Sequence, residues 1–112
     1  MVCDSVSSMS EYIQIETTFR TEDDAKKVIN ALLGKSLIAC AQWCDINSAY
    51  VWEKKRFNEK EVLLKVKTQS VLYKDCEKLI KQNHPYKVPQ ITVTRYDGSE
   101  DYLRWVDESV AR

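Results

Sequence analysis

The residue best suited to chemistry in this sequence is His84, the only histidine among the 112 residues. A neutral imidazole is a good ligand for copper, zinc or nickel, so His84 is a candidate metal ligand. One ligand does not make a site, and the position beside Pro85, at an expected helix end, also suits a structural histidine that caps carbonyl groups or packs on Tyr86. In a symmetric oligomer, neighbouring copies could supply the missing ligands.

Four cysteines offer softer metal ligands. Their number and spacing match neither a disulfide scaffold nor a four-ligand zinc site, so we expect reduced thiols. Cys40 and Cys76 fall at apolar positions and are expected to be small buried residues rather than nucleophiles. Cys44 lies beyond an apolar stretch and is the better candidate for metal capture, while Cys3 could bind metal nonspecifically.

A second candidate site combines acidic, basic and aromatic residues. The charged part is a series of acidic and then basic residues, Glu59, Glu61, Lys65 and Lys67. Its simplest interpretation is a solvated strand face with cross-strand pairing. The alternative is a ligand-binding cleft between subunits, in which Lys67 with Tyr86 or Tyr102 binds an anion and Trp52 provides a stacking surface.

Catalytic patterns are missing from the sequence. It has no Ser-His-Asp ordering, no phosphate-binding loop, no glycine-rich turn and no obvious pair of catalytic carboxylates. We therefore predict a protein that is not an enzyme and that needs no organic cofactor.

Hydrophobic periodicity predicts the elements that would position these residues. Thr21 can cap a helix whose apolar residues recur at helical spacing up to Gly34, and Thr68 or Ser70 can cap a second helix that ends at 83–85. A last helix is expected over 100–110. Strands are expected over 12–18, over 37–41 with a bend before 49–52, over 61–67 and over 91–96, with 53–60 as an exposed hairpin tip.

The resulting order, β-α-β-β-α-β plus a C-terminal helix, is the split βαβ pattern of an α+β ferredoxin-like fold. Two helices cover only one face of such a sheet. The strand over 37–41 is apolar enough to be buried on both faces, and aromatic residues gather on or beside a long hairpin. We expect partner subunits to cover this surface, and the alternative is an extra-thick monomer core.

Composition narrows the partners and the location. Seventeen basic and seventeen acidic residues cancel, which argues against nucleic acid and anionic membranes as partners. No apolar run is long enough to span a bilayer, and the N-terminus lacks the features of a signal peptide, so a cytoplasmic location is expected. Residues 1–10 are expected to form a flexible tail, and 11–112 a single domain.

Six short motifs, taken in order, resemble the CutA divalent-cation tolerance family from about residue 12 to residue 105. They are Thr17-Thr18, Leu37-Ile38-Ala39-Cys40-Ala41, Tyr50-x-Trp52, Glu61-x-x-Leu64-x-x-Lys67-Thr68, His84-Pro85-Tyr86-x-Val88-Pro89 and Asp101-Tyr102-Leu103-x-Trp105. The resemblance implies a homotrimer of ferredoxin-like subunits whose long hairpins pair across subunits. It also implies an architecture like that of the PII signalling proteins, which bind small ligands between subunits.

The sequence departs from this family at the hairpin and at the metal ligands. No glycine follows Trp52, so the tip lacks a residue that readily takes a positive φ. Some bacterial members bind copper through a cysteine at the position of Thr17 and a second histidine at that of Asn83, and this chain keeps only His84.

The leading hypothesis is a cytoplasmic CutA-like homotrimer that takes part in tolerance to divalent metal ions and binds Cu²⁺ or another divalent cation, with His84 as the first candidate ligand. One alternative is a PII-like sensor of a small anion. The other is a trimeric scaffold for partner proteins.

Overall fold

The computed structural model describes residues 11–111, so the predicted tail over 1–10, with Cys3, lies outside the described residues. The predicted α+β class and ferredoxin-like element order are confirmed, including the C-terminal helix. The elements are β2 (Tyr12–Phe19), α2 (Glu22–Gly34), β3 (Cys40–Trp52), β4 (Lys55–Gln69), a short 3₁₀ helix η2 (Ser70–Leu72), α3 (Tyr73–Asn83), β5 (Thr92–Arg95) and α4 (Glu100–Ser109).

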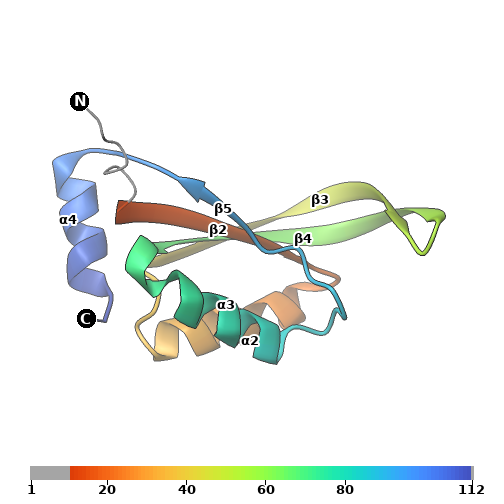
Figure 1. The fold of residues 1–112 in the computed structure, drawn as a ribbon, viewed down its shortest axis with the longest axis horizontal. Coiled ribbons are helices and arrows are strands. Elements are labelled where there is room, and N and C mark those ends of the chain that lie inside the picture. The colour runs from red at the N-terminus through yellow and green to blue at the C-terminus, as the bar shows by residue number, and fades with distance from the viewer. Residues whose placement is uncertain (1–10, 112) are drawn as a thin grey trace.

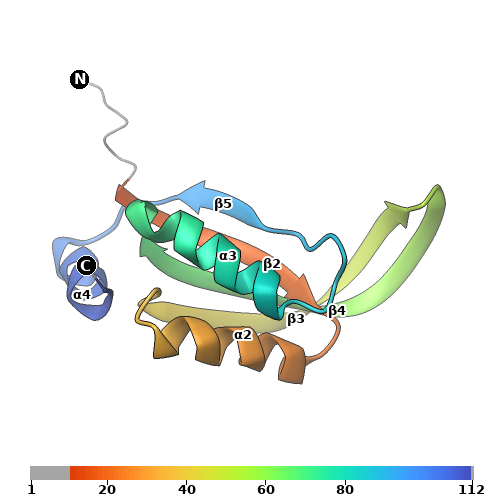
Figure 2. The ribbon, with the colours of Figure 1, turned by 60° about the horizontal axis from the view of Figure 1, so that its bottom comes forward.

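The four strands form one antiparallel sheet in the order β3-β4-β2-β5. Helices α2 and α3 lie side by side on one face of this sheet, and α4 stands at the end of the sheet remote from the hairpin tip (Figures 1 and 2). The β3–β4 hairpin runs well beyond the helices. Its distal part, residues 46–60, is called the arm below, and the rest of the described chain is called the body.

The core lies between the helices and the middle of the sheet. Alternate residues of β2 and β4 face the helices, because successive side chains of a strand point to opposite faces. Thr21 starts α2 by accepting the Asp24 N–H at 3.2 Å, as predicted. Burying one Val, Leu or Ile side chain contributes about 1.5–3 kcal/mol. The largest fully buried apolar side chains are Ile15, Phe19, Val28, Leu32, Ile38, Leu64, Val66, Ile80 and Val106.

The predicted cap of the second helix is wrong. Neither Thr68 nor Ser70 caps α3, which follows η2 without a side-chain cap. Strand β4 continues to Gln69, so Thr68 lies inside the sheet, where its buried hydroxyl donates to the Leu37 carbonyl at 2.6 Å. That hydrogen bond gives the Thr68 hydroxyl a partner in the core and leaves it no role at the helix start.

The predicted strand over 37–41 and the bend after it are also wrong. Leu37 and Ile38 are buried but precede β3, which runs unbroken from Cys40 to Trp52. Thirteen consecutive pairs join β3 to β4, and Asn47 and Ser48, the expected bend residues, pair with Lys60 and Glu59. Continuous pairing with β4 therefore overrides the local turn preference of Asn and Ser.

The hairpin tip is shorter than predicted. Glu53 and Lys54 alone form the turn, with φ of 52° and 68°, and β4 begins at Lys55. Two positive φ values in a two-residue loop match the twist of the flanking strands, which favours this turn even without glycine. Left-handed backbone costs a non-glycine residue about 1–2 kcal/mol, so the tip is strained.

The helix-free face of the body is polar, contrary to the expectation of a bare apolar face. On β2 and β4 this face carries Gln14, Glu16, Lys65, Lys67 and Gln69. Three exposed apolar side chains lie together on the arm, where Val51 is 67% exposed and Tyr50 and Trp52 are about 40% exposed. Others, such as Trp43 and Trp105, are exposed on the body, so the arm carries a part of the apolar surface available to a partner.

Candidate functional site

His84 lies where α3 meets the end of β2. Residue 84 follows the last helical residue in an extended conformation, and Pro85 prevents the helix from continuing. The His84 Nε2 atom is 2.8 Å from the Thr18 carbonyl and 3.1 Å from Thr17 Oγ1. The Nδ1 atom accepts the Tyr86 backbone N–H at 3.1 Å. The ring also stacks on Phe19, with centroids 4.3 Å apart.

These contacts fix the imidazole as neutral. Because Nδ1 accepts a hydrogen bond, Nε2 carries the proton and donates it to the Thr18 carbonyl. Burial lowers the pKa of His84, and the hydrogen bond to Thr18 opposes this shift without reversing it. The ring therefore caps a carbonyl and packs on Tyr86. A metal ion would have to displace one of these partners, so His84 as a metal ligand remains a prediction.

Glu61 lies on β4, just beyond the last residue that pairs with β2, and is hydrogen-bonded to Tyr86. Strand alternation places Glu61 on the helix-free face of the sheet, because the next residue, Val62, faces the helices. The Tyr86 hydroxyl donates to Glu61 Oε2 at 2.7 Å, and the Glu61 residue is only 9% exposed. Burial, and then the Glu61 carboxylate, raise the pKa of Tyr86. None of the ion pairs within residues 11–111 involves Glu61. The positive charge of Arg20 also acts on the Tyr86 hydroxyl, where it opposes this rise in pKa, but it forms no ion pair with Glu61. A nearly buried carboxylate with one direct hydrogen-bond donor and no ion pair is only partly compensated.

Two further metal-ligating side chains lie near Glu61 on this face. Glu59, two residues earlier on β4, accepts the Tyr50 hydroxyl at 2.8 Å. Cys44 is exposed and pairs with Leu63, which makes it a diagonal neighbour of Glu61, with about 7–8 Å between such positions. In the single chain, no three His, Cys, Asp or Glu residues between 11 and 111 are close enough to hold a metal ion together.

The other described cysteines have different surroundings. Cys76 is buried, its pKa is raised to about 12 by that burial, and its Sγ donates to the Leu37 carbonyl at 3.5 Å. This matches the predicted small buried residue. Cys40, which was expected to be buried as well, is only half-buried because it lies at the start of the edge strand β3. Burial raises the pKa of the neighbouring Tyr102, and the charge of Cys40 and a hydrogen bond to it raise that pKa further.

Lys67 and Tyr102 meet at the α4 end of the sheet. The Lys67 ammonium donates to Gln42 Oε1 at 3.2 Å and lies 5.6 Å from the centroid of the Tyr102 ring. Lys67 forms no ion pair with an acid among the described residues. The Tyr102 ring holds the ammonium by a cation–π contact, and this positive charge, without an acidic partner in residues 11–111, could attract a small anion.

Sequence reasoning missed the residue that anchors α4. Asp107 accepts the Tyr12 hydroxyl at 3.0 Å and the Gln69 side-chain amide at 2.8 Å. An acidic residue on a helix is usually solvated, so its type gave no reason to expect a buried contact. The only sequence feature that could have indicated one is that Asp107 directly follows Val106, which was expected to face inward. Asp107 thus ties α4, and with it Tyr102, to β2 and β4.

The five residues predicted to line a cleft do not meet in one place within the chain. Glu61 lies with Tyr86, and Lys67 lies with Tyr102. Trp52 pairs with Lys55 beside the tip, twelve residues from Lys67 along β4, or roughly 40 Å along a strand. A cleft that includes Trp52 requires a second chain.

Sequence comparison identifies relatives of this chain. A sequence model described as "CutA1 divalent ion tolerance protein" matches residues 13–109. The "Divalent-cation tolerance protein CutA" of Pyrococcus horikoshii is 39% identical over 101 residues, which cover 89% of this chain and 99% of the relative. A "Probable divalent-cation tolerance protein cutA homolog" of Encephalitozoon cuniculi is 31% identical over 103 residues, covering 91% and 90% of the two chains.

Solved structures show the same architecture. CutA1 from Pyrococcus horikoshii matches with a TM-score of 0.86 at 38% identity, over 89% of this chain and 99% of that chain. A protein from Archaeoglobus fulgidus described as a periplasmic divalent cation tolerance protein CutA matches with a TM-score of 0.87 at 30% identity, over the same shares of the two chains. The similarity therefore extends over nearly all of the described fold.

Proposed function

The chain belongs to the CutA1 divalent ion tolerance family, and we propose that it acts in tolerance by binding a divalent cation at Glu61 on the helix-free face of the sheet. The observation that carries this proposal is the state of the Glu61 carboxylate. It is almost buried, it accepts one hydrogen bond from Tyr86, and it has no ion-pair partner among the described residues. Leaving a buried charge unpaired is destabilising, and a bound cation would remove that penalty.

The neighbouring donors determine which cations the site would accept. Carboxylates such as Glu61 and Glu59 suit hard divalent cations, which can bind through one or two carboxylates and complete their coordination with water. Cys44 on the same face adds a softer ligand, which suits copper or zinc. Copper is an alternative cation, with His84 and Cys44 as its proposed ligands. Within one chain these two side chains lie on opposite faces of the sheet, so they would have to come from different subunits, and His84 would have to give up its present hydrogen bonds.

A homotrimer is the proposed assembly. Strand β3 is thirteen residues long and lies at the sheet edge, and its distal part carries exposed Tyr50, Val51 and Trp52. A long edge with apolar side chains needs a cover. The family resemblance implies three copies, which could bring the arm of one subunit to Glu61 or Lys67 of another.

Calorimetric titration of Mn²⁺ and Cu²⁺ into the wild type and matched variants tests the cation proposal. We expect Glu61→Gln to weaken Mn²⁺ binding at least tenfold, because the charged ligand becomes a neutral amide. The control Glu108→Gln changes an exposed glutamate on α4 and should bind as the wild type does. Equal affinities for wild type and Glu61→Gln would contradict the proposal, and a loss of Cu²⁺ binding in His84→Ala alone would move the site to His84.

A second candidate function is recognition of a small anion by Lys67. The Lys67 ammonium, which has no acidic partner among the described residues, favours it. A thermal-shift screen of nucleotides and organic anions should show a stabilised wild type and an unaffected Lys67→Gln variant, because a ligand at a hundredfold excess over its Kd adds about 2.7 kcal/mol. Absence of any shift in the wild type would remove this candidate.

We also propose a cytoplasmic, non-catalytic protein. None of the helices within residues 11–111 is long and apolar enough to cross a membrane. The described cysteines are free thiols, which suits a reducing compartment. Because the Archaeoglobus relative is described as periplasmic, cell fractionation is the test of location.

A further inference from the structure

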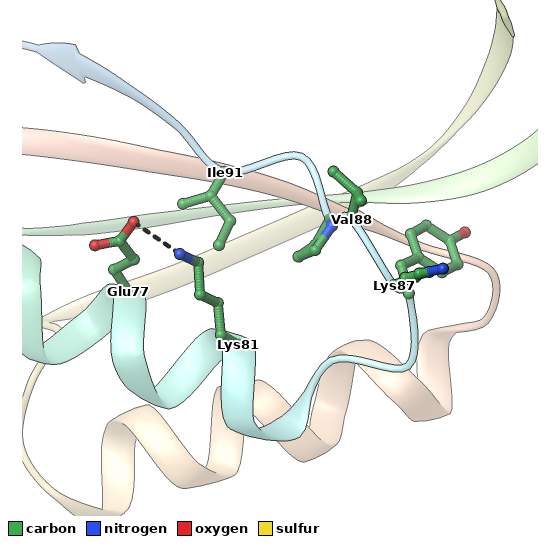
Figure 3. Close-up of a pocket in the computed structure, with 7 residues that line it drawn as sticks. Glu77, Lys81, Lys87, Val88 and Ile91 are labelled. Atoms are coloured by element: carbon green, nitrogen blue, oxygen red, sulfur yellow. Dashed lines mark ion pairs between the residues drawn. The ribbon is translucent and has the colours of Figure 1, made fainter. Parts of the chain in front are cut away.

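A hollow of about 540 Å³ lies between α3 and the segment that connects it to β5. Figure 3 shows Glu77 and Lys81 on α3 facing Val88 and Ile91 of that segment, with Lys87 beyond them. The volume is within the range of roughly 300–1,000 Å³ that is typical of small-molecule sites. The lining residues are Glu77, Lys81, Tyr86, Lys87, Val88, Pro89 and Ile91.

The wall of this hollow is positively charged on balance. Lys81 is paired with Glu77 at 3.3 Å, and more than half of the Lys81 side chain remains exposed. Lys87 forms no ion pair with an acid in the described part of the chain. Two ammonium groups and one carboxylate therefore leave an excess of one positive charge, which favours a monoanion.

The rest of the lining is apolar. Ile91 packs against the hydrophobic core, while Val88 is 65% exposed. Pro89 fixes the backbone between them, so these apolar groups are held in place. A ligand with a short hydrocarbon body would remove Val88 and Ile91 from water, and its anionic end would reach Lys81 or Lys87.

We propose that this hollow binds small carboxylates with a short apolar body. A polyvalent inorganic anion would leave the apolar wall exposed, and a neutral hydrocarbon would leave the free Lys87 charge without a partner. Tyr86 contributes to the wall, while its hydroxyl holds Glu61 at 2.7 Å. The hollow is nevertheless a separate site from the proposed cation site, and binding in it requires no metal ion.

Two-dimensional amide NMR titration of the metal-free protein tests the proposal, with hexanoate as the probe. Saturable shifts are expected at Lys81, Lys87 and Ile91. Acetate keeps the charge without the apolar body, and hexanamide keeps the body without the charge, so both should bind more weakly. Lys87→Gln should weaken hexanoate binding by about 1.5-fold to fivefold, the usual range for an exposed charge pair.

The matched control is Lys78→Gln, which removes an exposed lysine of α3 that does not line the hollow. It should bind hexanoate as the wild type does. The proposal is overturned if hexanoate shifts do not saturate, or if they map away from the hollow. It is equally overturned if hexanamide binds as tightly as hexanoate, or if Lys87→Gln and Lys78→Gln have the same effect.

Discussion

The body and the arm use the same two strands in opposite ways. In the body, β4 packs Val62, Leu64 and Val66 under two helices, and each of them is at most 5% exposed. In the arm, β3 and β4 pair only with each other, and apolar side chains such as Val51 face solvent. A two-stranded hairpin on its own is marginally stable in water. The difference indicates that the body provides most of the stability of the chain, and it motivates the proposal that the arm is a surface for association.

The largest effect on stability should come from the body. Leu64→Ala removes a fully buried side chain at the centre of the sheet, and we expect the free energy of unfolding to fall by about 3 kcal/mol in urea denaturation. Val71→Ala, at a valine that is 81% exposed on η2, is the control and should change it by less than about 0.5 kcal/mol. Similar losses in the two variants would mean that the body is not the stabilising region.

The next effect concerns His84, at the boundary between body and arm. His84→Gln leaves the Tyr86 N–H or the Thr18 carbonyl without its partner, and should cost about 1–3 kcal/mol at pH 7.5.

The wild type should also lose stability on acidification. Because the pKa of His84 is lowered in the folded state, its contribution is fully present above the ordinary value of 6.5 and is lost as the pH falls from there towards the folded pKa. His84→Gln should lack this component as the pH falls below 6.5. Unfolding curves of the two proteins with identical pH dependence in this window would show that the imidazole is not held neutral.

The smallest effect should come from the arm tip. Replacing Glu53 by Asn and Lys54 by Gly supplies residues that accept positive φ, and should stabilise the protein by about 1 kcal/mol. Glu53→Ala is the control, because alanine keeps the strain and should give no gain. A loss of stability in the Asn-Gly variant would mean that the charged side chains of the tip make contacts that outweigh its backbone strain.

Local patterns predicted most of the body. Helix α2 and strand β2 follow from apolar spacing and from the Thr21 cap, which depend on neighbouring residues only. The errors arose where distant residues decide the structure. Thr68 bonds to Leu37 rather than capping a helix, and β3 stays unbroken because β4 pairs with it throughout.

The candidate site was less predictable for the same reason. Sequence reasoning named Glu61, Tyr86, Lys67 and Tyr102, but not which of them meet, since each pair joins elements that are far apart in the chain. The hydrogen bonds that occupy both nitrogens of His84 come from Thr18 and Tyr86, and no spacing in the sequence indicates them. The sequence does not indicate that Glu61 is nearly buried and has no ion pair among the described residues, because both depend on tertiary structure.

Sedimentation equilibrium of the wild type and of the double variant Tyr50→Ser and Trp52→Ser tests most directly whether the arm is an association surface. The wild type should have a mass about three times that of the 13.1 kDa chain, and the double variant should dissociate at micromolar concentration because its exposed aromatic surface is lost. A monomeric wild type, or a variant that stays fully associated, would contradict the assignment of the arm.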